Sequence, residues 1–151
     1  AGLLTPPNMG IYNVSKHAVV SLTETLYQDL HLVTDQISAS VLCPYFVPTG
    51  INKSERNRPG ELPADKPTKS QLIGQAMSDK AVGSGKVTAA MVAQKVFDAI
   101  AADQFYIFSH PKALGNVQHR MESILQIANP ADPFAERPEI GIELKAALRA
   151  E

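Results

Sequence analysis

The sequence has only one cysteine, Cys43, so it cannot form a disulfide within the chain. It also lacks a signal peptide and any apolar run long enough to span a membrane. These absences predict a cytoplasmic protein that does not enter a membrane.

Charge of one sign is not in excess, because the sequence has 14 basic and 15 acidic residues. The basic residues are scattered along the chain. A nucleic-acid or anionic-membrane surface normally shows as a basic cluster, so we expect neither partner. With 44% hydrophobic residues the composition is that of a globular domain. No repeat or Gly/Ser linker divides the chain, and it starts with Ala1 and not with Met. We therefore interpret it as a fragment of one domain.

Two segments predict the first half of an α/β fold. Apolar residues recur every four positions in an amphipathic helix from Tyr12 to Val33. Residues 37–43 are short and rich in apolar and small residues, and they stop at Pro44, as in a buried parallel strand. The helical stripe consists of Val14, Ala18, Leu22, Leu26 and Leu30.

The rest of the chain continues the α/β order after a long interruption. Prolines and glycines make regular structure improbable over residues 44–67, and loops of that length often act as lids. A helix over 70–80 should end at Gly83-Ser84-Gly85, and Thr88 should cap a helix that runs to Ala101. We expect a strand at 105–108, a helix over 113–128 and a proline-rich tail from Pro130 that ends in one or two helical turns. The buried stripe of the helix to Ala101 should comprise Met91, Val92, Val96 and Ile100.

Tyr12 and Lys16 form a Tyr-x-x-x-Lys pair at the start of the long helix. Four helical residues correspond to a rise of about 6 Å and a rotation of about 40°, so the two side chains share a face. A lysine ammonium beside a phenol, together with the positive end of the helix dipole, favours the phenolate. Tyr12 could therefore serve as a general acid or base, although a solvated pair on a helix surface has the same spacing.

The context of this pair resembles the short-chain dehydrogenases/reductases. Residues 10–20, Gly-Ile-Tyr-Asn-Val-Ser-Lys-His-Ala-Val-Val, are similar to the active-site helix of that family. Residues 43–49, Cys-Pro-Tyr-Phe-Val-Pro-Thr, lie where the family has a Pro-Gly-x-Val-x-Thr turn beside the nicotinamide. The resemblance extends to the strand at 105–108, and the fold that it implies is the C-terminal portion of a doubly wound parallel-sheet Rossmann fold.

The resemblance also implies roles for individual residues. Tyr12 would be the catalytic acid/base, and Lys16 would tune it and hold the nicotinamide ribose. In the turn, Pro44 would border the cofactor, Val47 would hold the carboxamide through its backbone, and Thr49 would contact the carboxamide or diphosphate. Tyr45 replaces the usual glycine, so the loop path or the substrate pocket must differ from the common pattern.

The family's glycine-rich cofactor turn, its Asn-Asn-Ala-Gly segment and its catalytic serine do not occur in the sequence. Residues 1–151 would thus be the C-terminal part of one NAD(P)-binding domain whose N-terminal half is absent. The choice between NAD and NADP is made in that half.

The function implied is hydride transfer between NAD(P)(H) and a secondary alcohol or ketone, which the apolar lid suggests to be hydrophobic. We expect a homodimer or homotetramer. A sugar epimerase or dehydratase with the same Tyr/Lys pair is one alternative, and a non-catalytic dinucleotide-sensing protein is another.

Other reactive side chains have no clear role. The histidines at 17, 31, 110 and 119 lack metal-ligand spacing, so we expect no metal site. Cys43 has no charged neighbour in the sequence that would activate its thiol. Apolar residues at 72, 73 and 77 could line a substrate pocket or simply pack in a core.

Overall fold

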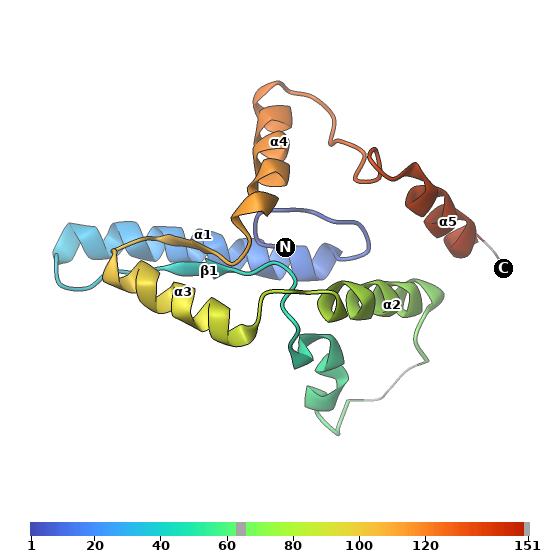
Figure 1. Cartoon of the computed structure of the whole chain (residues 1–151), viewed down its shortest axis with the longest axis horizontal. Coiled ribbons are helices and arrows are strands. Elements are labelled where there is room, and N and C mark those ends of the chain that lie inside the picture. The colour runs from blue at the N-terminus through green and yellow to red at the C-terminus, as the bar shows by residue number, and fades with distance from the viewer. Residues whose placement is uncertain (63–65, 150–151) are drawn as a thin grey trace.

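The computed structural model describes residues 1–62 and 66–149 and shows two parallel strands lying between helices (Figure 1). The fold is α/β, as the sequence predicts. The first elements are α1 (Gly10–Val33), β1 (Val41–Cys43), the 3-10 helix η1 (Gly50–Asn57) and α2 (Lys69–Gly83). They are followed by α3 (Ala89–Ala101), β2 (Tyr106–Phe108), the 3-10 helix η2 (Pro111–Ala113), α4 (Leu114–Leu125) and α5 (Pro138–Arg149).

The two strands define which edge of the sheet can bind a ligand. Leu42 pairs with Ile107, and the N–H of Val41 donates to the carbonyl of Phe105 at 2.8 Å. Because the strands are parallel, both carboxyl ends meet at one edge, and α1 and α3 run on either side of the strands (Figure 1). In open α/β sheets this edge is where ligands bind.

Local sequence signals place three of the helix ends. The Thr68 hydroxyl accepts from the N–H of Gln71, whose side chain accepts from the N–H of Thr68, and this capping box starts α2. Thr88 caps α3 as predicted, with its hydroxyl accepting from the N–H of Met91. α2 ends at Gly83, at the predicted Gly-Ser-Gly break.

Several predicted elements differ from those of the structure, and the helix predicted over 113–128 ends at Leu125. The strand covers residues 41–43 and not 37–43, because β2 offers only three residues to pair with. Regular structure does occur between residues 44 and 67, where η1 begins behind a Thr49 cap. The C-terminal helix α5 has 12 residues and not one or two turns, and Pro138 is suited to its first position.

The apolar stripe on α1 is largely uncovered. Val14, Leu22 and Leu26 are 67%, 71% and 47% exposed, and the buried residues of α1 are Asn13 and Val20. On α3, Val92 is buried, but Met91 and Ile100 are exposed, which contradicts the predicted stripe at those positions. On α1 this stripe lies opposite Glu24 and Tyr27, which meet the sheet at Tyr106 and Phe105.

The exposed surface of the whole chain gives the same picture. It amounts to 11570 Å², whereas a compact monomer of this mass exposes about 7,500 Å². The buried apolar residues are few, namely Val20, Val41, Val82, Val92, Ala99 and Ile107. The faces of α1 and α3 therefore present apolar surface that a further layer of protein would have to cover.

Candidate active site

The connection between α1 and β1 places Tyr12 at the carboxyl edge of the two parallel strands. The last turn of α1 leads into the start of β1, so the first turn of α1, which contains Tyr12, lies at the edge where β1 ends.

The structure brings Tyr12 and Lys16 together on the surface of α1. The Lys16 ammonium lies over the Tyr12 ring, 5.3 Å from its centroid, which is within the range of a cation–π contact. Tyr12 is 39% exposed, and Lys16 is exposed as well. The Ser15 hydroxyl donates to the Tyr12 carbonyl at 2.8 Å. The phenol is thus accessible, has a cation beside it and lies in the first turn of a helix.

Asn13, which follows Tyr12, fixes the start of α1 against the preceding loop. Its side chain is buried, and its amide donates to the Pro6 carbonyl at 3.0 Å. Its backbone N–H donates to the Met9 carbonyl at 2.7 Å. Asn8 makes the turn before the helix with a φ of 61°, a left-handed conformation that asparagine tolerates well. These contacts hold the helical turn that carries Tyr12.

The predicted cofactor loop, residues 44–49, follows β1 at the same edge. Pro44 is exposed and Val47 is half-buried. The Thr49 hydroxyl accepts from the Ile51 N–H at 3.4 Å at the start of η1, which leaves its own proton available to a ligand. The loop therefore exposes the predicted cofactor-binding positions where the strand ends.

Tyr45, which stands in place of the family's glycine, fits the loop without backbone strain. Its φ is not among the positive values found in the described residues. Its ring contacts the Phe46 ring, with centroids 4.4 Å apart, and meets the His110 ring edge to face at 5.7 Å. The loop path therefore does not need a glycine at this position.

Two residues that support this loop were not found from the sequence. Ser109 follows β2, and its Oγ accepts from the Tyr45 N–H at 2.9 Å. A Cβ on Gly85 would lie 2.7 Å from the Phe46 carbonyl oxygen and 2.9 Å from Cδ of Pro48. The sequence predicts Gly85 only as part of a helix break. Its lack of a side chain also allows this close backbone approach.

Replacing Gly85 with alanine is expected to displace the cofactor loop. The new methyl group must push the Phe46 carbonyl away, a crowding that costs on the order of 1–3 kcal/mol. We expect a complete protein with Gly85→Ala to bind NAD about tenfold more weakly by isothermal titration calorimetry.

The matched control for this variant is Gly83→Ala. A Cβ at Gly83 meets nothing within 4 Å, so this substitution leaves the loop untouched. Equal NAD affinity in the two variants would show that the close approach of Gly85 does not position the loop.

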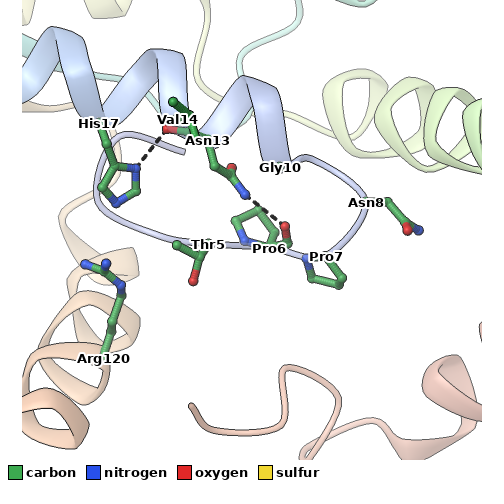
Figure 2. Close-up of a pocket in the computed structure, with 9 residues that line it drawn as sticks. All are labelled: Thr5, Pro6, Pro7, Asn8, Gly10, Asn13, Val14, His17 and Arg120. Atoms are coloured by element: carbon green, nitrogen blue, oxygen red, sulfur yellow. Dashed lines mark hydrogen bonds between the residues drawn. The ribbon is translucent and has the colours of Figure 1, made fainter. Parts of the chain in front are cut away.

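A wide-open hollow of about 570 Å³ lies on a different face of α1 (Figure 2). It is bounded by the loop before α1, by Asn13 and His17 on the helix, and by Arg120 on α4 (Figure 2). The Nδ1 of His17 lies 2.9 Å from the Asn13 carbonyl. Because neither Tyr12 nor Lys16 lines this hollow, it is separate from the predicted chemistry.

The remaining reactive side chains, one cysteine and two histidines, are half-buried or make contacts with neighbouring residues. Burial raises the pKa of the Cys43 thiol, which disfavours a nucleophilic thiolate. His31 packs against Tyr27, and His110 contacts Ser109. Over residues 1–62 and 66–149, no three His, Cys, Asp or Glu side chains gather as a metal site would require. In the same ranges, no helix combines the length and apolar character needed to cross a bilayer.

Comparisons with known proteins agree on one class. No protein-family profile matches the chain. A "CLA biosynthesis dehydrogenase/reductase" from Lactiplantibacillus plantarum is 33% identical over 134 residues, which cover 86% of this chain and 46% of that protein. A crystal structure of a short-chain dehydrogenase/reductase from Burkholderia phymatum in complex with NAD matches with 53% identity and a TM-score of 0.85.

The second match covers 87% of this chain and 47% of the solved one, so the chain spans about half the length of both proteins. Over this span the chain is similar in sequence and in fold to short-chain dehydrogenases/reductases.

Proposed function

We propose that this chain forms the C-terminal half of an NAD(P)-binding domain that transfers a hydride between the cofactor and a secondary alcohol or ketone. The observation that carries the proposal is the Tyr12–Lys16 pair, exposed in the first turn of α1 at the edge where the parallel strands end. The similarity to short-chain dehydrogenases/reductases gives this pair a context in which it is catalytic and not merely a surface contact.

Tyr12 supplies the proton chemistry in this proposal. During alcohol oxidation the phenolate removes the hydroxyl proton while the hydride leaves for the nicotinamide, and reduction reverses both steps. The Lys16 ammonium lies over the ring, and in this proposal it binds the ribose hydroxyls of the cofactor.

In this proposal the residues after β1 hold the nicotinamide end of a dinucleotide. Val47 offers its backbone to the carboxamide, Thr49 offers a hydroxyl, and Pro44 lies at the turn. All of them lie at the carboxyl end of a parallel strand, where such cofactors bind. NAD is favoured over NADP because the solved relative, 53% identical, was crystallised with NAD.

The exposed apolar faces of α1 and α3 indicate a surface against which another part of the protein packs. We propose that the N-terminal half of the complete domain packs against the free edge of β1 and the adjoining helix faces. By the family resemblance, the complete protein would then assemble as a homodimer or homotetramer.

The test uses the complete protein with NAD or NADP and a panel of apolar secondary alcohols. We expect dinucleotide binding by calorimetry and steady accumulation of reduced cofactor with at least one alcohol. A sugar epimerase or dehydratase would reduce its cofactor only transiently. A dinucleotide-sensing protein would bind NAD without consuming any alcohol, and either result would contradict the proposal.

A further inference from the structure

Ser109 is a buried polar residue at the carboxyl edge of the sheet. It follows β2 directly and is 3% exposed. Its Oγ accepts from the Tyr45 N–H at 2.9 Å and lies 2.8 Å from Nδ1 of His110. The hydroxyl can donate its own proton to that nitrogen when the His110 ring is neutral, so both of its hydrogen-bonding functions have partners.

The bond to Tyr45 extends the hydrogen-bond ladder of the sheet. In a parallel pair, every second residue of one strand donates to its neighbour, beginning here with Val41 and continuing through Cys43 to Tyr45. At Tyr45 the acceptor is the side chain of Ser109 and not a backbone carbonyl. The serine thus adds one rung at the point where the chain leaves β1 and enters the loop.

This rung matters because residues 44–48 have few other anchors. Pro44 and Pro48 have no N–H to donate. Among the described residues, no backbone–backbone bond outside helices and strands involves positions 44–48. Gly85 lies against the Phe46 carbonyl, and the Tyr45 ring meets the His110 ring.

We propose that Ser109 is a positioning residue for the dinucleotide. Its hydroxyl holds the backbone of Tyr45, two residues before Val47. It thereby fixes the position at which Val47 and Thr49 meet the nicotinamide end of the cofactor. The inference rests on the proposed function, because it assumes that residues 44–49 bind NAD. Ser109 itself touches neither cofactor nor substrate in this account.

Replacing Ser109 with alanine leaves the Tyr45 N–H unpaired and lets the loop sample other positions, which NAD must reorder on binding. In the complete protein we expect Ser109→Ala to raise the KM for NAD about tenfold, the factor that loss of one such hydrogen bond produces. The kcat at saturating NAD should change less than about threefold, because the Tyr12–Lys16 pair is untouched.

Ser40→Ala is the matched control. Ser40 joins the same two segments at the opposite end of β1, where its hydroxyl donates to the Gln104 carbonyl at 3.0 Å. This variant loses a similar bond far from the cofactor edge, so its melting temperature should fall while its KM for NAD stays at the wild-type value. An equal KM in Ser109→Ala and wild type, or equal rises in both variants, would overturn the proposal.

A second measurement does not depend on a variant. Hydrogen exchange on the complete wild-type protein should show the Tyr45 amide protected, as expected for an amide held by a buried acceptor. Exchange at the rate of a free loop amide would also overturn the proposal. Failure of the proposed function is recognised separately, because the wild-type protein would then either bind no NAD or bind it without consuming any alcohol.

Discussion

Replacing Tyr12 with phenylalanine in the complete protein is expected to lower turnover by about 100-fold or more, while NAD affinity changes little. The substitution keeps the ring beneath the Lys16 ammonium and removes only the ionisable hydroxyl. Loss of a general acid or base typically costs a factor of about 10²–10⁴ in rate. Steady-state kinetics at saturating NAD and substrate measure the loss, and calorimetry with NAD shows whether binding survives.

Tyr27→Phe is the control for this prediction. Tyr27 lies on the same helix, and its ring packs against His31 and Phe105, so the substitution removes a hydroxyl far from the first turn. It should leave turnover at the wild-type level. Near-normal turnover in Tyr12→Phe would remove Tyr12 from the catalytic assignment, whatever the control shows.

The second large effect concerns residues 1–151 expressed alone. We expect this chain to show no cooperative thermal transition that shifts upward with NAD. Val14 and Leu22 are mostly exposed to water, and Leu26 is nearly half exposed. Among the described residues, β1 also has one edge without a neighbouring strand. Burying each such side chain stabilises a fold by about 1.5–3 kcal/mol, and their sum approaches the net stability of about 5–15 kcal/mol of a whole domain.

Differential scanning calorimetry with and without NAD measures this, alongside light scattering for the aggregation that exposed edges and apolar faces promote. The complete protein under the same conditions is the control. A cooperative transition of the isolated chain that rises with added NAD would show that these residues form a self-sufficient binding unit.

The sequence was most informative where local chemistry decides structure. The helix carrying Tyr12 and Lys16, the cap at Thr88, and the parallel strand that stops before Pro44 all depend on signals within a few residues. The resemblance to short-chain dehydrogenases/reductases was also recognisable from the sequence, and the comparisons confirm it.

Features that depend on distant parts of the chain could not be predicted in this way. Strand β1 is short because its length is set by β2, about 60 residues further along the chain. The exposure of Leu22 depends on what packs against α1, which periodicity alone does not reveal. Ser109 and Gly85 support the cofactor loop through contacts across the sheet edge, and neither belongs to a recognisable motif.

The central claim is that this chain carries the proton-transfer half of a hydride-transfer site. The most direct measurement incubates the complete protein with NAD and a secondary alcohol deuterated at its carbinol carbon, and then analyses the cofactor by mass spectrometry. The account predicts deuterium on the nicotinamide ring in the wild-type protein and strongly reduced labelling in Tyr12→Phe. Wild-type protein that binds NAD but leaves the cofactor unlabelled with every alcohol of the panel would contradict it.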